Sequence, residues 1–158
     1  SSGNDPDQFK YATNSFSAHF VKLGVHVQEG TVKIIQVVST GDAGKIINEK
    51  AARSQMLGGV VGGIGMALKE SLEIDHRTGK VTNASLNDYH VPLHTDVPKT
   101  EVWFVNQPDP YINEIGAKGL GEIALIGFAA AVTNAVYNAI GVRVRDLPVT
   151  PAKLGFTQ

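Results

Sequence analysis

The chain of 158 residues is long enough for one domain with a sizeable core, and its 14 Lys and Arg residues nearly balance its 15 Asp and Glu residues. This balance excludes strong electrostatic attraction to nucleic acid or to an anionic membrane surface, so neither is an expected partner. No cysteine is present, which excludes disulfides, a thiol nucleophile, a protein-ligated iron–sulfur cluster and a Cys-type zinc site.

A leader and a β-hairpin are predicted for the N-terminal part of the chain. Residues 1–13 are expected to be disordered or derived from the expression vector, because the start is polar and contains Gly and Pro. Alternation in Ser15 to Gln28 and β-branched residues in Thr31 to Ser39 predict two antiparallel strands joined by a Glu-Gly turn. His19 and His26 lie on these strands without a third ligand at a convincing spacing, which favours ordinary strand histidines over a metal site.

The segment Thr40 to Lys45, TGDAGK, is predicted to be a loop. It has the lysine of a phosphate-binding loop, but Ile46 follows in place of Ser or Thr and the upstream glycine is missing. A nucleoside-triphosphate site is therefore rejected. Asn48 then suits the cap of a helix that runs from about Glu49 to about Leu72.

Five glycines interrupt this helix in the run MLGGVVGGIGMAL. Each glycine in a helix interior costs about 0.5–1 kcal/mol relative to alanine. The cost indicates a surface that must come close to the backbone, and two candidates remain open: another helix or a flat cofactor. Gln55 lies in the first turns, where its amide could contact the edge of a heterocycle or face solvent.

The middle of the chain predicts short, irregular elements. Asp75 to Lys80 reads as a hairpin-like turn, Asn83 to Leu93 as an ordered but irregular strand-loop, and Thr100 to Val105 as a strand. A short strand at Val142 to Val144 and a final short helix opened by Thr150 and Pro151 complete the prediction. Strands and helices mix without strict alternation, which favours an α+β fold with helices on one side of a sheet.

A glycine-rich loop, GAKGLGE from Gly116 to Glu122, precedes an uncharged run from Ile123 to Ile140. This run predicts a buried helix closed by Gly141 in the left-handed conformation, with Glu122 in its first turn. A membrane span is disfavoured because the run barely reaches the length required and contains Thr and Asn. Two roles remain open for Glu122: a first-turn acid that favours the helix dipole, or a carboxylate at the mouth of a cavity.

Several segments together resemble one protein family. In chain order they are SFSAHFVKLGV, DAGKIIN, ARSQMLGGVVGGIGMAL, LNDYHVP with DVP, EVWFV, GAKGLGE and NAVYNAIGVRVRDLPVTPAKL. They resemble the C-terminal part of the molybdopterin-binding subunit of the xanthine dehydrogenase/aldehyde oxidase family, and are most similar to its bacterial aldehyde-oxidising branch. The resemblance covers about Asn14 to Leu154. It implies a C-terminal molybdopterin-binding domain over residues 14–158, built as a mixed or antiparallel sheet with two long helices packed on it.

The resemblance also implies a reaction and its cofactors. Such enzymes oxidise aldehydes or N-heterocycles with water as the oxygen source, and the pterin dithiolene holds the molybdenum, so no protein metal ligand is required. We expect molybdopterin, in the cytosine dinucleotide form, with Mo. Iron–sulfur clusters and FAD are expected on partner domains or subunits. The expected partners are therefore the remainder of the molybdenum subunit, the iron–sulfur and flavin subunits, and a small-molecule substrate.

The family's site residues transfer onto matching positions of this chain. Glu122 is implied to be the general base that takes the proton from the molybdenum-bound hydroxyl. Gly121 would bring its backbone close to the metal ligands, and Gln55 would contact the pterin or its phosphate-bearing tail. Lys118 and Gly119 would line the same cavity.

The family subunit is several times longer than this chain, which therefore holds the implied base and about half of a pocket. We expect the isolated chain to be inactive and not to retain molybdopterin tightly. The alternative function is a non-catalytic assembly domain whose glycine-rich helix forms an interface, including a homodimer of this fragment. The expected compartment is the cytoplasm or the periplasm.

Overall fold

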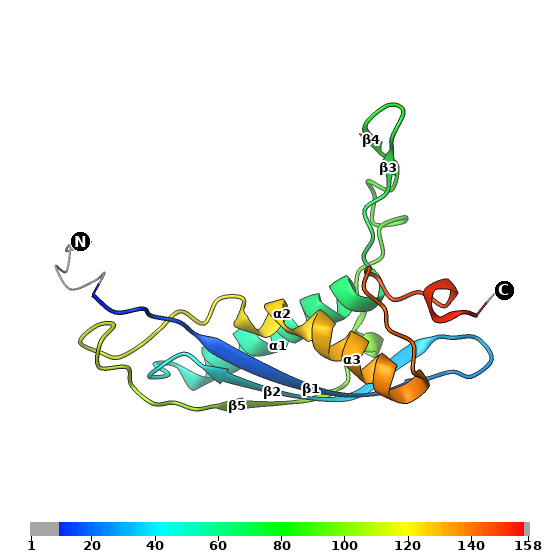
Figure 1. Ribbon diagram of the computed structural model, residues 1–158. Helices are drawn as coiled ribbons and strands as arrows, with labels where there is room; N and C mark the ends of the chain where they lie inside the picture. The colour runs from blue at the N-terminus through cyan, green and yellow to red at the C-terminus, as the bar shows by residue number, and fades with distance from the viewer. Residues whose placement is uncertain (1–9, 157–158) are drawn as a thin grey trace.

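The computed structural model describes residues 10–156, in which helices cover one face of a three-stranded sheet (Figure 1). Strand β1, Phe16–Val25, pairs antiparallel with β2, Val32–Asp42, and β2 pairs parallel with β5, Lys99–Phe104. The predicted α+β class, the hairpin and the later strand are thus confirmed. The leader prediction lies outside the described residues over positions 1–9.

The predicted loop at Thr40 to Lys45 is wrong in its first half. Strand β2 continues through Thr40, Gly41 and Asp42, because these residues pair with β1 on one side and the first two also pair with β5 on the other. The hydrophobic alternation ends at Ser39, so the sequence pattern stops before the ladder does. The loop proper begins at Ala43.

Helix α1, Glu49–Leu68, begins where the sequence predicts. The Asn48 side chain accepts a hydrogen bond from the Ala51 N–H at 3.0 Å, as expected for a capping residue. The helix ends four residues before the predicted Leu72. The N–H groups of Lys69 and Glu70 both bond to the Gly65 carbonyl, and Glu70 folds back into the space that a side chain at position 65 would fill.

The second helical segment is broken in two, which corrects the prediction of one helix over Ile123 to Ile140. Helix α2, Ile123–Ile126, and helix α3, Phe128–Ile140, meet at Gly127, where an added Cβ would lie 3.1 Å from the His19 ring. The combined run is long and apolar enough to cross a membrane by composition alone. Here it packs against β1 and α1, and only one face of α3 is buried. Gly141 does adopt the predicted left-handed conformation, with φ of 73°.

The glycines of α1 allow α2 and α3 to approach its backbone. A Cβ at Gly59 would lie 2.6 Å from that of Ala124, and a Cβ at Gly63 would lie 2.7 Å from that of Phe128. At these two positions helix packing, one of the two open interpretations, accounts for the glycine. The resulting core lies between helices and sheet and includes Val37, Val60, Ile64, Phe128 and Val132.

Between α3 and residue 156 the structure has no strand, so the predicted strand at Val142 to Val144 is wrong. This segment pairs with no strand among the described residues, but Val144 is buried in a second cluster with Val136, Val149 and Leu154. The short helix η2, Ala152–Leu154, follows Thr150 and Pro151 as predicted. The alternating apolar residues of this segment therefore reflect burial in the second cluster and not pairing with a strand.

The segment between α1 and β5 projects from the body as an arm (Figure 1). The two short strands β3, Ile74–Asp75, and β4, Lys80–Val81, form its tip around the predicted turn. The Asp75 carboxylate accepts hydrogen bonds from the Arg77 N–H and the Thr78 hydroxyl. A short helix η1, His94–Asp96, leads from the arm back to β5.

His19 predicts a loss of stability at mildly acidic pH. Its Nδ1 lies 2.9 Å from the buried Ser39 hydroxyl, while its Nε2 is buried without a hydrogen-bond partner in the described chain. Burial lowers the pKa of His19, and the Ile123 carbonyl opposes this only in part. The unfolded chain therefore binds the proton more readily, and stability falls as the pH drops below about 6.5, by at most about 1.4 kcal/mol per pH unit.

Urea unfolding between pH 7.5 and pH 5 measures this effect. The carboxyl groups of Asp42 and Asp96 also have lowered pKa values. Their protonation changes stability only below about pH 4, outside the range from pH 7.5 to pH 5. We expect His19→Gln to flatten the pH dependence. The variant His26→Gln, at an exposed histidine of the same hairpin, serves as the control and should retain the dependence. An equal slope in the His19 variant and the unmodified chain would contradict the assignment.

Candidate functional site

A hydrogen bond joins the two glycine-rich segments. The Gln55 side chain, in the second turn of α1, donates from Nε2 to the Gly121 carbonyl at 2.7 Å. The two residues are 66 positions apart in sequence, and both are exposed. The structure thus brings the predicted Gln55 and Gly121 together at one edge of the helical layer.

The loop before Glu122 is fixed at its base by backbone pairing. The Lys45 N–H donates to the Gly116 carbonyl and the Lys118 N–H donates to the Ala43 carbonyl, each at 2.8 Å. A side chain at Gly44 would collide with the Gly116 carbonyl, so glycine is required there. Because β2 ends immediately before Ala43, these bonds tie the loop to the sheet.

The side chain of Lys118 forms an ion pair within the protein. Its Nζ lies 3.1 Å from Asp42 Oδ2, and the side chain is only 8% exposed. The Gly44 N–H, followed by the Lys118 ammonium, lowers the pKa of the Asp42 carboxyl, although desolvation opposes this. The pair holds the loop against the end of β2. That Lys118 also lines a cofactor cavity stays a prediction.

Ser15, just before β1, and Ser17, within it, bond to the loop and to the start of α2. The Ser15 hydroxyl donates to the Gly119 carbonyl and the Ser17 hydroxyl donates to the Ile123 carbonyl. These contacts join residues more than 100 positions apart. Sequence reasoning missed both serines and Asp42, because nothing in the local patterns around them indicates a partner so distant.

Glu122 occupies the N-cap position of α2 rather than the first turn of a long helix, which corrects the prediction. Its backbone carbonyl accepts from the Leu125 N–H, but its side chain makes no capping hydrogen bond. The side chain is exposed, and within residues 10–156 its carboxylate has no hydrogen bond or ion pair. The carboxylate is therefore available to a group from outside this chain.

Three glycines, one in α1 and two in the loop before Glu122, expose their backbone to open space. A Cβ added to Gly58, Gly119 or Gly121 would meet no atom within 4 Å. Gly58 lies three residues after Gln55 on α1, and Gly121 has φ of +33°. Helix packing explains Gly59 and Gly63 but leaves Gly58 without a reason in this chain. These open backbones fit a flat group that lies against them.

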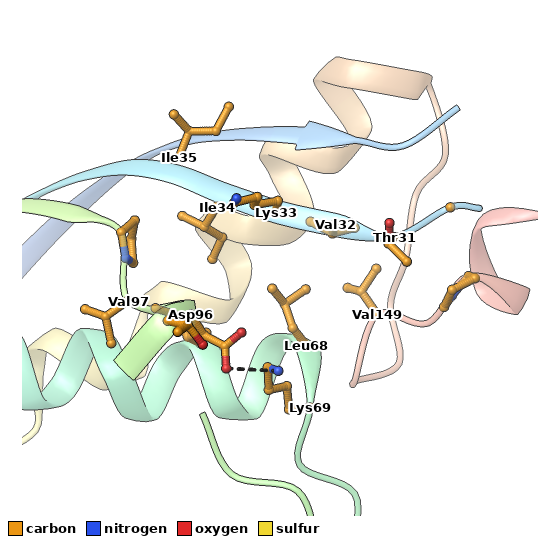
Figure 2. A pocket seen from close by; sticks show the side chains of 15 residues that line it. Thr31, Val32, Lys33, Ile34, Ile35, Leu68, Lys69, Asp96, Val97 and Val149 are labelled. Carbon is orange, nitrogen blue, oxygen red and sulfur yellow. Dashed lines mark ion pairs between the residues drawn. The ribbon is translucent and has the colours of Figure 1, made fainter. Parts of the chain in front are cut away.

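A separate hollow of the described chain lies away from the candidate site. That cavity, of about 820 Å³, lies between β2, the C-terminal end of α1 and the segment before β5, and includes none of the predicted site residues (Figure 2). Gln55, Gly121 and Glu122 instead lie on an open surface. One wall of a binding site has this form when the opposite wall comes from another part of a protein.

Comparison with known proteins decides the family. The family model described as "Molybdopterin cofactor-binding domain" matches residues 2–98, more than half of the chain. This chain belongs to that family. The matched range of the molybdopterin cofactor-binding domain includes Gln55 and Gly58 and ends before Gly119.

Curated relatives match along almost the whole chain. The domain is 46% identical over 145 residues to the aldehyde oxidoreductase molybdenum-binding subunit PaoC of Escherichia coli K12, covering 92% of this chain and 20% of that protein. It is 40% identical over 147 residues to the xanthine dehydrogenase molybdenum-binding subunit of Escherichia coli O157:H7, covering 92% and 19%. The chain thus spans about one fifth of the length of these relatives.

Solved structures have the same fold. The molybdopterin cofactor-binding domain matches the aldehyde oxidoreductase of Desulfovibrio desulfuricans with a TM-score of 0.80 and 31% identity, over 89% of this chain and 15% of that chain. It matches quinoline 2-oxidoreductase of Pseudomonas putida 86 with a TM-score of 0.79 and 28% identity, over 87% and 18%. The predicted fold, helices packed on a sheet as in molybdenum hydroxylases, is confirmed.

Proposed function

We propose that residues 14–158 form the C-terminal molybdopterin-binding domain of a molybdenum hydroxylase, which oxidises aldehydes or N-heterocycles with oxygen from water. The observation that carries the proposal is the Gln55–Gly121 hydrogen bond, which sets the exposed Glu122 beside the open backbones of two glycine-rich segments. The similarity to an aldehyde oxidoreductase subunit supports aldehydes as the substrate class.

The described residues fit a molybdopterin group on one side. Gly58, Gly119 and Gly121 would let its flat ring system approach the backbone, and Gln55 would hold the loop in place while offering its remaining amide groups. When bound, molybdopterin would supply a molybdenum Lewis acid that accepts two electrons from the substrate. The cytosine dinucleotide form is proposed here, with iron–sulfur clusters and FAD carried by partner domains or subunits.

Glu122 acts as the general base in this proposal. Its carboxylate takes the proton from the oxygen nucleophile as that oxygen attacks the electron-poor carbon of the substrate. Such a positioned base contributes about 10²–10⁴-fold to a rate when it lies within hydrogen-bond reach of the proton. Gln55 positions Glu122 indirectly, by fixing the carbonyl of the residue before it.

Gln55 can be tested by its effect on the cofactor. We expect Gln55→Ala in the intact subunit to lower the affinity for molybdopterin by up to about tenfold, because losing one hydrogen bond loosens the Gly121 loop at a cost of about 0.5–1.5 kcal/mol. Molybdenum content after gel filtration is the readout. The neighbouring Ser54→Ala, whose hydroxyl bonds only to Lys50 of the same helix, is the control. Equal molybdenum retention in both variants would contradict the role of Gln55.

The place of the domain in a longer subunit is tested with the chain itself. Because one wall of the site is open, we expect the 158-residue chain to lose molybdopterin on gel filtration and to show no turnover. Elemental analysis of the eluted protein measures the retained molybdenum. Tight retention by the chain alone would contradict the proposal that the opposite wall lies in another part of the subunit.

A second candidate function is a non-catalytic assembly domain. The face of the sheet opposite the helices exposes Phe16, Phe20 and Trp103, each more than 60% exposed, and such a patch is typical of an interface. A homodimer through this face is one form of that function. The two candidates differ at Glu122, whose substitution leaves turnover unchanged if the domain serves assembly alone.

A further inference from the structure

The N-terminal part of β2 has a free edge. Strand β5 pairs with β2 only over Gln36–Gly41. Val32, Lys33 and Ile34 therefore pair with β1 on one side and with no strand on the other, and Ile35 lies at the register shift, without a partner in either strand. Within residues 10–156 no backbone or side-chain hydrogen bond reaches that second edge. The row of unpaired N–H and C=O groups is about 13 Å long at about 3.3 Å per residue.

A hollow runs along this edge. Its volume is about 820 Å³, and its apolar walls include Ile34 of β2, Leu68 of α1, Val97 before β5 and Val149 near the C-terminal end (Figure 2). An ion pair between Lys69 Nζ and Asp96 Oδ2, at 3.0 Å, lies at one side. The hollow thus combines unpaired backbone groups with an apolar lining.

Local structure keeps β5 out of this space. Helix η1 turns the chain immediately before β5, and the Asp96 carboxylate secures that turn by accepting from the Leu93 N–H. Pro98, which lacks an N–H, stands at the entrance of β5 and cannot donate to an extended ladder. The gap along Val32–Ile35 is therefore built into the fold of this chain.

We propose that an extended segment from the part of the molybdenum-binding subunit outside this chain adds to β2 along Val32–Ile35 and places apolar side chains in the hollow. The inference rests on the proposed place of this domain in a longer subunit. The relatives contain enough additional polypeptide for such a segment, since this domain spans only 20% of the PaoC sequence. On the face that carries Lys33 and Ile35, an acidic or polar residue of the added strand would suit Lys33.

The shape of the hollow favours a single extended segment over a second copy of this domain. The free edge is recessed between Leu68 of α1 and the segment from Val149 to Pro151, both of which line the cavity. A second copy would present its own β2 edge between the same flanking walls, and the walls of the two copies would collide. A slim extended segment has no such walls. Its backbone would satisfy the free groups of β2.

Hydrogen exchange of the unmodified intact subunit tests the added strand. We expect the amides of Val32–Ile35 that point away from β1 to exchange at least about 100-fold more slowly than free amides. The amides of Val38 and Ser39, which lie between two paired strands, are the internal reference and are expected to be slow as well. Exchange at the rate of free amides would overturn the proposal. Molybdenum content is measured on the same sample, so a failure of cofactor binding is distinguished from a failure of strand addition.

A photo-crosslinking residue in place of the exposed Lys33 identifies the occupant in the intact subunit. Capture of a peptide from the same polypeptide, outside the 158 residues, supports the proposal. Capture of a second copy or of a partner subunit, or capture of no peptide, would overturn it. The unmodified protein used for hydrogen exchange keeps the test valid even if the crosslinking variant folds poorly.

Discussion

Replacing Glu122 by Gln in the intact enzyme is expected to reduce turnover by about 10²–10⁴-fold while molybdenum content stays unchanged. Glutamine keeps the size and polarity of the side chain but cannot accept a proton at neutral pH. Because the Glu122 side chain makes no hydrogen bond or ion pair within residues 10–156, its replacement should not disturb the domain's own packing. The loss should therefore appear in kcat rather than in folding or cofactor retention.

Glu114→Gln provides the matched control, because Glu114 is an exposed carboxylate just before the same loop. It removes the same charge without touching Gly121 or Glu122, and we expect its turnover to equal that of the unmodified enzyme. If Glu122→Gln turns over as fast as Glu114→Gln with molybdopterin bound, Glu122 is not the base. The assembly function would then be favoured.

Replacing either of two adjacent glycines of α1 by alanine should change the free energy of unfolding, in opposite directions at the two positions. At Gly59 an added Cβ would lie 2.6 Å from the Ala124 Cβ and 3.1 Å from backbone atoms of α2, so the helices must separate. We expect Gly59→Ala to lower the free energy of unfolding by about 1–3 kcal/mol. At Gly58 the Cβ would meet no atom within 4 Å, and Gly58→Ala should raise it by about 0.5–1 kcal/mol through helix propensity.

Urea denaturation of the two variants measures both changes in the free energy of unfolding. A further result is expected for Gly58→Ala in the intact subunit, where the added methyl group would occupy the backbone surface assigned to molybdopterin. Molybdenum retention should fall although the domain itself is more stable. Equal stability of the two variants would show that α1 and α2 are not packed as described, and full molybdenum retention in Gly58→Ala would remove Gly58 from the site.

Much of the fold follows from local signals. Alternating apolar residues predict the hairpin of β1 and β2, Asn48 predicts the start of α1, and Gly141 predicts the end of α3. Each of these signals acts within a few residues, through side-chain periodicity, capping or backbone conformation. The start of α1 and the end of α3 therefore agree with the prediction.

The errors arise where a tertiary contact, and not side-chain periodicity or capping, decides the local structure. The break at Gly127 depends on the ring of His19, and the early end of α1 depends on Glu70 folding back over Gly65. Val144 is buried by packing against Val136, and this burial produces the apolar pattern that is interpreted as a strand. His19 and Gly127 are far apart in sequence, so no local window contains both partners of the first contact.

Some features of the candidate site were likewise predictable from the sequence and others were not. The proximity of Gln55 to the Gly121–Glu122 segment was implied by the family resemblance and is realised by a single hydrogen bond. The support behind that segment was not foreseeable: Asp42 holds Lys118, and Ser15 holds the Gly119 carbonyl. These polar contacts join separate elements and follow only from the folded chain.

A structure of the intact subunit with molybdopterin bound tests the central claim most directly. We expect the Glu122 carboxylate within hydrogen-bond reach of the cofactor at its metal centre, about 2.6–3.2 Å from the atom that carries the proton. Gly58 and Gly121 should face the cofactor with their backbones, while Gln55 keeps its bond to the Gly121 carbonyl. A cofactor bound elsewhere, with Glu122 facing other protein or solvent, would contradict the account.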